Sequence, residues 1–218
     1  MKTTMKKVIY FFVMISFVIV ANGCSEDSED AFDIDLSQDD TIDLQDNITI
    51  SQKDADALLF ILGEEKLARD TYEFLDKTWG LNQFANIKKS EQTHIDAIEN
   101  LLKQNEISYT ILPEGVFSND ELQAHYNTFK VDGVKSVIDA LKIGATIEDL
   151  DIKDLEDFVL ETENAQIINV YQSLQCGSRN HLRSFMNGLD KNGGTYTPQF
   201  ITQDEFNSIV NSSNEQCN

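Results

Sequence analysis

Prolines and glycines are scarce in this 218-residue chain, which contains two prolines and ten glycines. So few turn-forming residues argue against an all-β fold and against collagen-like or low-complexity chains. Three cysteines are too few for a disulfide scaffold. Basic residues are also scarce, because 17 Lys and Arg stand against 38 Asp and Glu and the formal net charge is −21. A protein that binds nucleic acid needs a basic surface for the phosphates, so we expect no nucleic-acid partner.

The chain begins with an apolar run that is short for a membrane helix. Lysines at positions 2, 6 and 7 precede Val8–Val20, in which Ser16 is the one polar residue. A membrane-spanning helix needs about 20 apolar residues. The shorter run is typical of the core of a signal peptide, and we predict a signal peptide over residues 1–23.

A cysteine follows this run directly. The sequence Ala21-Asn22-Gly23-Cys24 resembles the lipobox of bacterial lipoproteins, although Asn22 stands where a small or apolar residue is usual. The resemblance implies cleavage before Cys24, acylation of Cys24 and a lipid-anchored protein of the bacterial cell envelope. The alternative is ordinary signal cleavage with an incidental Cys24.

Acidic residues dominate the next segment. Residues 25–50 contain ten Asp or Glu and no Lys or Arg. Such a segment repels itself and buries little, so we predict a flexible tether over residues 24–50. An acidic stretch after a lipidated cysteine also resembles the export signal of Bacteroidota lipoproteins on the outer-membrane surface. A solvated spacer explains the composition equally well.

Residues 51–218 have the length of one folded domain, and they show helical periodicity almost throughout. The long helices are expected at about residues 51–79, 83–104, 134–162 and 163–189. Ser51 or Asp54 caps the first of these helices and Gly80 ends it. Shorter helices are expected at Asp120–Phe129, capped by Ser118, and near Asp204–Val210, within a C-terminal tail to Asn218 that is otherwise irregular.

The four long helices predict the fold class. Helices of about 25 residues are about 37 Å long, and they bury single apolar stripes best against one another. The link between the second and third long helices, residues 105–132, is long enough to cross the length of such a bundle. We therefore predict an all-α, ferritin-like four-helix bundle with one long crossover.

Each predicted long helix places polar side chains in its apolar stripe. They are Glu65 in the first helix, Glu91 and His94 in the second, Glu148 with Asp151 beside it in the third, and Ser178 and His181 in the fourth. An unpaired buried carboxylate is costly, so four helices that offer such groups to one core predict a shared cation. Carboxylates and imidazoles suit divalent iron, manganese or zinc.

Two segments resemble the ligand motifs of rubrerythrin-type proteins. Glu65-Lys66-Leu67-Ala68-Arg69 is similar to their Glu-x-x-Ala-Arg, and Glu91-x-x-His94 is similar to the motif of their second helix. The i, i+3 spacing places Glu91 and His94 on one helix face. Longer segments, over residues 63–70, 140–148 and 177–185, resemble a branch of the ferritin-like superfamily catalogued as domain of unknown function 2202. This resemblance covers about residues 55–210.

The superfamily resemblance implies a di-iron carboxylate centre. It makes Glu65 and Glu148 carboxylate ligands, Glu91 the bridging carboxylate, and His94 and His181 the imidazole ligands. The full pattern has Glu three residues before the last His, where this chain has Ser178. Either Asp151 replaces the missing carboxylate, or the site holds one metal, or it is degenerate.

For several other residues the sequence allows a structural explanation. Arg69 and Arg183, like Ser178, can orient ligating carboxylates, whereas surface or structural pairing of the arginines explains them as well. Glu64 is expected in exposed pairs with Lys66 or Arg69, and Tyr72 in the core. In an oxidising envelope Cys176 and Cys217 either form a disulfide or stay free.

Two function classes follow. The first is an envelope-anchored metalloprotein with two iron ions, or with manganese or zinc, that acts as an oxidoreductase of ferroxidase or peroxidase type. The second is a lipoprotein that binds metal or a partner without catalysis, and Ser178 favours it. The lipid anchor and acidic arm hinder a closed shell, so we expect a monomer or dimer rather than a ferritin cage.

Overall fold

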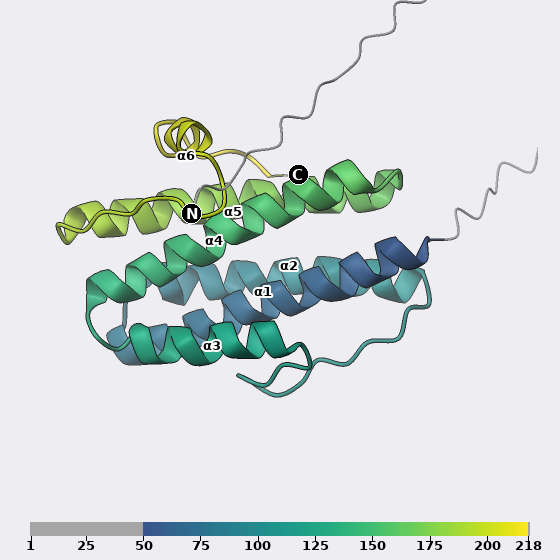
Figure 1. The fold of residues 1–218 in the computed structure, drawn as a ribbon, viewed down its shortest axis with the longest axis horizontal. Coiled ribbons are helices and arrows are strands. Elements are labelled where there is room, and N and C mark those ends of the chain that lie inside the picture. Colours follow the sequence, from purple (N-terminus) through teal and green to yellow (C-terminus); the bar gives the residue numbers. More distant parts are fainter. Residues whose placement is uncertain (1–49, 218) are drawn as a thin grey trace, which may run out of the picture. The chain divides into compact units, whose positions relative to one another are not determined.

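The structure, a computed structural model, describes residues 50–217. Within that range the chain forms six helices and no strand: α1 (Gln52–Trp79), α2 (Asn82–Gln104), α3 (Asp120–Asp132), α4 (Val137–Glu161), α5 (Ala165–Lys191) and α6 (Gln203–Val210) (Figure 1). The all-α prediction is confirmed. No helix in this part combines the length and apolar character that crossing a membrane requires. The predicted signal peptide, the lipidation of Cys24 and the tether up to residue 49 lie outside the described residues.

The predicted helix ends hold where a capping group is present. Ser51 Oγ accepts a hydrogen bond from the Asp54 amide at the start of α1, and Gly80 ends the helix in the left-handed region at φ 62°. α3 begins at Asp120 as predicted, but the side chain of Asn119 rather than Ser118 caps it. The start of α4 is later than predicted, because Ser136 caps it through the Asp139 amide.

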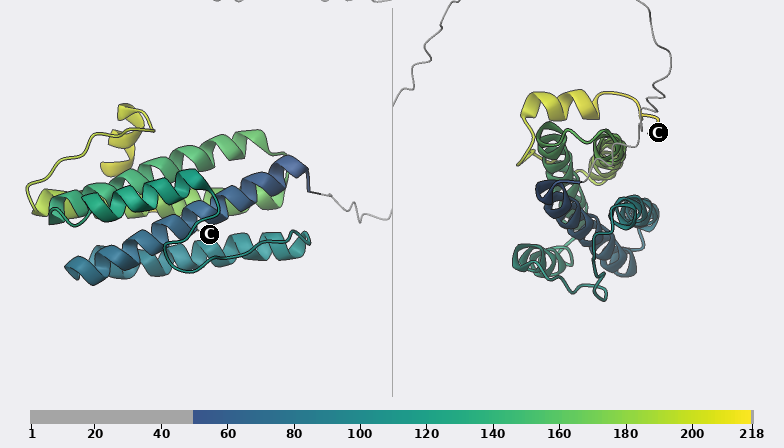
Figure 2. Two further views of the ribbon diagram at one scale, coloured as in Figure 1. Left: turned by 60° about the horizontal axis from the view of Figure 1, so that its bottom comes forward. Right: turned by 90° about the vertical axis from the view of Figure 1, so that its right-hand side faces the viewer.

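The four long helices pack as two pairs. α1 lies along α2 and α4 lies along α5, while α1 also contacts α4 and α2 contacts α5. Figure 1 shows that α2 and α4 begin at the same end, so residues 105–136 carry the chain back over the length of the helices. The end-on view in Figure 2 shows α3 beside α1 and α6 outside the α4–α5 pair.

The apolar core is divided into two clusters, one toward each end of the long helices. One contains Tyr72, Phe84 and Phe185, and the other contains Ile98, Tyr171 and neighbouring leucines. On α2 the order along the chain is Phe84 and Ile87 of the first cluster, then Glu91 and His94, then Ile95 and Ile98 of the second. On α5 His181 likewise lies between Leu174 and Phe185. The polar stripe residues therefore form a layer between two apolar clusters.

A buried carboxylate fixes the start of the C-terminal tail. Asp149 of α4 accepts hydrogen bonds from Tyr196 Oη and from the backbone amides of Gln199, Phe200 and Ile201, at 2.5–3.2 Å. Four donors replace the water that this carboxylate loses on burial. Segment 196–201 is thereby held against α4, and α6 follows it.

The end of the tail is tied to α5. Cys176 and Cys217 form a disulfide, which settles the alternative that the sequence left open. Glu215 Oε1 and Oε2 accept hydrogen bonds from Arg179 and Arg183, and these two guanidiniums lower the pKa of Glu215 to about 2. The predicted irregular tail is therefore a fixed part of the domain.

We predict that Cys217→Ser lowers the free energy of unfolding by about 2–4 kcal/mol, because the disulfide closes a long loop in the unfolded chain. Thermal denaturation followed by circular dichroism should show a melting temperature about 5–15 °C lower. A reductant should lower the wild-type value to that of the variant and leave the variant unchanged. Equal melting temperatures for wild type and variant would contradict this account of the tail.

Candidate metal centre

Six titratable side chains from the four long helices meet in the polar layer. The carboxylates are almost fully buried, with exposed fractions of 1% for Glu65, 1% for Glu91, 0% for Glu148 and 4% for Asp151. His94 and His181 are each 8% exposed, and their rings stack with centroids 5.5 Å apart. The structure thus brings together every ligand candidate that the sequence proposed, although Asp151 is less close than the rest.

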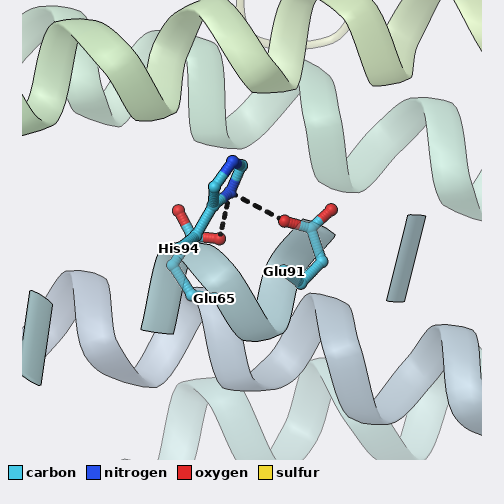
Figure 3. Close-up of side chains that lie close together, drawn as sticks. All are labelled: Glu65, Glu91 and His94. Atoms are coloured by element: carbon cyan, nitrogen blue, oxygen red, sulfur yellow. Dashed lines mark hydrogen bonds and ion pairs between the residues drawn. The ribbon is translucent and has the colours of Figure 1, made fainter. Parts of the chain in front are cut away.

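The first group consists of Glu65 from α1 with Glu91 and His94 from α2 (Figure 3). His94 Nδ1 lies 3.1 Å from Glu65 Oε2 and 2.9 Å from Glu91 Oε2. One nitrogen and two carboxylate oxygens therefore converge from two adjacent helices. The three-residue spacing of Glu91 and His94 provides two of the three donors.

The second group consists of Glu91 with Glu148 from α4 and His181 from α5. His181 Nδ1 lies 2.9 Å from Glu91 Oε1 and 3.3 Å from Glu148 Oε2. The other ring nitrogen, Nε2, is 2.9 Å from Ser90 Oγ. When Nε2–H donates to this hydroxyl, the lone pair of Nδ1 faces the carboxylates, which is the orientation that a metal ligand needs.

Glu91 connects the two groups. Its Oε2 faces His94 and its Oε1 faces His181, so each oxygen belongs to a different group. Glu91 Oε1, Glu91 Oε2, Glu148 Oε2 and His181 Nδ1 are all buried, and none makes a hydrogen bond of acceptable geometry. Oxygen and nitrogen atoms that lie about 3 Å apart without hydrogen bonds between them could all contact one cation placed among them.

Other buried carboxylates of the domain show that this arrangement is particular to the polar layer. Asp149 is saturated by the four donors described above, and Asp70 accepts hydrogen bonds from Lys66, Arg69 and the Gly115 amide. Within residues 50–217, no Lys or Arg forms an ion pair with Glu65, Glu91, Glu148 or Asp151. The polar layer therefore concentrates negative charge that only the two imidazoles offset.

The pKa values reflect this lack of counter-charge. Burial raises the pKa of Glu65, and burial together with the charge of Glu91 raises that of Glu148 to about 7. Burial acts to lower the pKa of His181, but the charges of Glu91 and Glu148 outweigh it and raise the value to about 10. Protons on these groups occupy the electrostatic role that a cation fills when it binds, so binding of a cation would release them.

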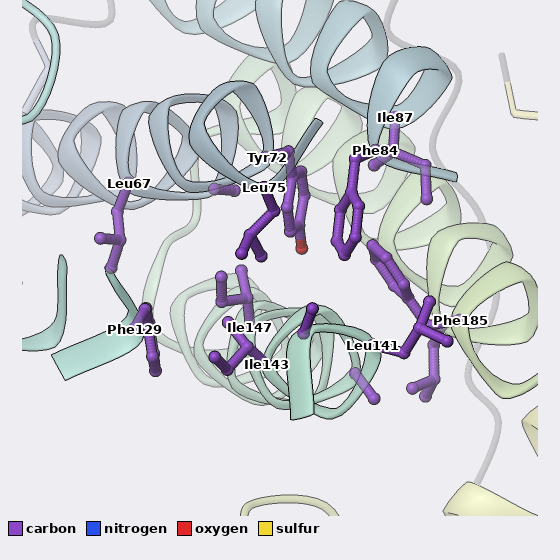
Figure 4. Packing of buried hydrophobic residues seen from close by; sticks show 14 of the residues in the cluster. Leu67, Tyr72, Leu75, Phe84, Ile87, Phe129, Leu141, Ile143, Ile147 and Phe185 are labelled. Atoms are coloured by element: carbon purple, nitrogen blue, oxygen red, sulfur yellow. The ribbon is translucent and has the colours of Figure 1, made fainter. Parts of the chain in front are cut away.

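Tyr72 and Ser90 contact the candidate ligands, a role that was not predicted for them from the sequence. The buried Tyr72 hydroxyl donates a hydrogen bond of 2.5 Å to Glu148 Oε1. Its ring packs against Phe84 and Phe185, which fixes the hydroxyl in place (Figure 4). Tyr72 lies two helical turns after Glu65 and on the same face, and that spacing was the available signal. Ser90 gave no signal, since it is an ordinary surface residue in the helical pattern.

Three predicted supporting roles are corrected. Arg69 binds its neighbour Asp70 and Gln92 of α2. Arg183 binds the Ile209 carbonyl, Ser212 and Glu215, which all belong to the C-terminal segment. Ser178 Oγ donates to the Leu174 carbonyl of its own helix rather than to a ligand. Glu64, expected at the surface, is only 3% exposed, because it faces α4.

Gly177, next to Ser178 on α5, leaves the space that the His94 ring occupies. A Cβ on Gly177 would lie 2.5 Å from His94 Nε2 and 2.7 Å from His94 Cε1. These distances are shorter than van der Waals contact, so the His94 ring packs directly on the backbone of α5. The glycine is therefore needed for the close approach of α5 to His94.

Comparisons with known proteins identify relatives of the domain. Residues 54–213 match the model of a family described as "Uncharacterized protein domain (DUF2202)". The chain is 46% identical over 169 residues to the uncharacterized protein MJ0754 of Methanocaldococcus jannaschii, a match that covers 77% of this chain and 91% of the archaeal protein. The crystal structure of that protein superposes with a TM-score of 0.75, over 76% of this chain and 96% of the other.

We predict that Gly177→Ala destabilises the protein. Gly→Ala inside a helix ordinarily stabilises by about 1 kcal/mol, but overpacking of a filled core costs about 1–3 kcal/mol. We expect a net loss of about 1 kcal/mol in denaturant unfolding, since the hydrogen bond between His94 Nδ1 and Glu65 Oε2 holds the His94 ring in place. Ser178→Ala is the matched control and should change stability by less than about 1 kcal/mol. A more stable Gly177→Ala would show that His94 does not pack against Gly177.

Proposed function

Because the chain belongs to the DUF2202 family of uncharacterized protein domains, we propose its function from the geometry of its own buried side chains. We propose that the domain binds two divalent metal ions within the polar layer. Iron is the preferred metal, and manganese or zinc are the alternatives. The chemistry would be ferrous oxidation or the reduction of oxygen or peroxide. The single observation that carries the proposal is Glu91, whose two oxygens face two separate carboxylate–imidazole groups.

The donor set fits two divalent ions in charge and in type. The four carboxylates Glu65, Glu91, Glu148 and Asp151 balance two divalent ions when both imidazoles are neutral. Carboxylate oxygen and imidazole nitrogen are ligands that iron, manganese and zinc accept. Glu65 with His94 would hold one ion, Glu148 with His181 the other, and Glu91 both. The orphaned buried atoms of this set support the assignment, because they lack hydrogen bonds inside the protein.

Asp151 is the proposed substitute for the carboxylate that Ser178 lacks. It is buried, and its Oδ2 makes no hydrogen bond. After burial itself, the charges that raise its pKa most are those of Glu65 and Glu148, one from each group. Asp151 nevertheless belongs to neither of the two three-residue groups. It would therefore bind at the edge of the site, whereas Glu91 would contact both ions.

The arrangement of the helices supports a ferritin-like bundle. Two helix pairs with a long crossover between α2 and α4 agree with that topology. So does the origin of the ligands, because each of the four long helices supplies at least one.

An iron pair would supply the electrons for oxygen or peroxide reduction. The chain's own residues would orient the ligands and exclude bulk water. Tyr72 and Ser90 hold Glu148 and His181 in position through hydrogen bonds. Because the ligands are at most 8% exposed, only small substrates such as oxygen, peroxide or the ions themselves could reach them.

The anchor proposed from the sequence would place this chemistry in the bacterial envelope. Acylation at Cys24 would tether the domain to a membrane, and the acidic segment that follows would direct it to the outer-membrane surface. The family match begins at residue 54, after this segment. We further propose that the domain acts as a monomer or dimer.

A second candidate function is metal binding without catalysis. Ser178 favours it, because this side chain bonds to its own helix and contributes no carboxylate to the polar layer. The same ligands would then serve to hold or scavenge metal in the envelope.

Metal content tests the proposed site. The full chain, purified in detergent and loaded anaerobically with ferrous iron, should bind two ions per chain by elemental analysis. Glu91→Gln should retain at most one ion. Loss of a residue that merely hydrogen-bonds to a metal ligand lowers metal affinity by roughly 10- to 100-fold, and the loss in Glu91→Gln should be larger. Glu99→Gln, which changes a surface residue of the same helix paired with Lys103, should bind like wild type. Unchanged metal content in Glu91→Gln would refute the assignment.

Oxygen consumption separates catalysis from binding alone. If the domain is an oxidase, the iron-loaded chain should oxidise ferrous iron in air faster than free ferrous iron and faster than Glu91→Gln. The readouts are an oxygen electrode and a ferrous-specific chelator. Two bound irons that are oxidised no faster than free iron would favour the non-catalytic function.

A further inference from the structure

A second set of carboxylates lies beside the metal centre and takes no part in it. Glu64 of α1 is 3% exposed, and the charge of the half-buried Asp154 on the contacting helix α4 acts on it. Glu64 Oε2 is buried and has no hydrogen-bond partner. In this respect Glu64 resembles the carboxylates of the polar layer, whereas Asp70 and Asp149 are saturated by donors.

These carboxylates continue the polar layer toward the surface. Glu148, Asp151 and Asp154 follow one another at three-residue intervals, so each step advances about 4.5 Å along α4 and turns about 60° around its axis. Their burial decreases in the same order, from 0% exposed through 4% to half-buried. At the outer end Asp154 interacts with the charge of Glu121 on α3, whose side chain is 76% exposed.

α1 contributes one carboxylate, Glu64, to this series. Glu64 precedes the candidate ligand Glu65, and its charge acts on Asp151. Glu64 therefore interacts through its charge with both the half-buried Asp154 and the buried Asp151. The nearest basic side chain that acts on Asp154, Lys153, forms its ion pairs with Glu156 and Asp157 at the surface. No Lys or Arg in residues 50–217 forms an ion pair with Glu64, Asp151 or Asp154.

We propose that Glu64 and Asp154 form a transfer site for divalent cations, through which ions pass from the surface near Glu121 to the polar layer. The inference rests on the proposed metal centre. A buried carboxylate with a free oxygen attracts a hard cation, and neighbouring carboxylates with graded burial let the ion exchange water for protein oxygens in steps. A path lined with charge of one sign also raises the local concentration of cations and their rate of arrival.

The rate of metal uptake tests this route. Metal-free full chain in detergent is mixed with Co²⁺ in a stopped-flow instrument, and the visible absorption of the bound ion is followed. We expect Asp154→Asn to take up Co²⁺ about tenfold more slowly than wild type, because the charge that guides the ion is lost. The final number of bound ions should be unchanged, because neither Asp154 nor Glu64 is a ligand of the centre.

Asp157→Asn provides the matched control. It makes the same chemical change on the same helix, one turn beyond Asp154, at a side chain that is 50% exposed and paired with Lys153. Its uptake rate should equal that of wild type. Glu64→Gln is the second variant, and it should slow uptake as Asp154→Asn does.

Each outcome decides the proposal. Equal rates in wild type and Asp154→Asn would overturn the route and leave Glu64 and Asp154 as a pair that shares a proton. Equal slowing in Asp154→Asn and Asp157→Asn would also overturn it, because general attraction by the acidic surface would then explain the effect. In both cases two bound ions would leave the proposed metal centre intact. A wild-type chain that binds no Co²⁺ would overturn the centre and the route together.

Discussion

Uncompensated negative charge in the middle of the helix core is the constraint on which the rest of this structure depends. Glu65, Glu91, Glu148 and Asp151 are buried without a Lys or Arg partner among the described residues, and only His94 and His181 face them. Removing carboxylates from water is costly, and the cost is recovered only by a cation or by protons. The polar layer is therefore stable only with bound protons or a bound cation. Because its side chains are polar, it separates the core into two apolar clusters.

The periphery of the domain holds the four long helices in the register that this layer needs. Asp70 joins α1 to the crossover through Lys66 and the Gly115 amide, and Asp149 joins α4 to segment 196–201. The Cys176–Cys217 disulfide ties the tail to α5, next to Gly177. Buried carboxylates thus have two roles in one molecule. Those saturated by donors fix loops, and those with free oxygens face one another.

The comparisons place the domain in a family without assigning chemistry to it. An archaeal relative that is 46% identical shares the fold over almost its whole length. Only this chain's own side chains point to metal, and Ser178 is the feature that most separates metal binding from oxygen chemistry.

The sequence by itself determined the helices and most of the ligand candidates. Helical periodicity and the capping residues Ser51 and Gly80 predicted α1 almost to its ends, because these signals act within a few residues. Polar residues in an apolar stripe identified Glu65, Glu91, His94, Glu148 and His181 for the same reason, since the helix period alone shows which face a residue occupies.

Only the tertiary structure decided what those side chains meet. The arginines gave a reasonable expectation of support for the ligands, yet Arg183 extends to Glu215 in the tail, 32 residues away in sequence. The functions of Tyr72, Ser90 and Gly177, and the burial of Glu64, also depend on contacts between helices that are distant in the chain. Periodicity fixes the face of a residue, but the partner on the opposite helix depends on how far each helix slides and turns in packing, and that is set by the whole core at once.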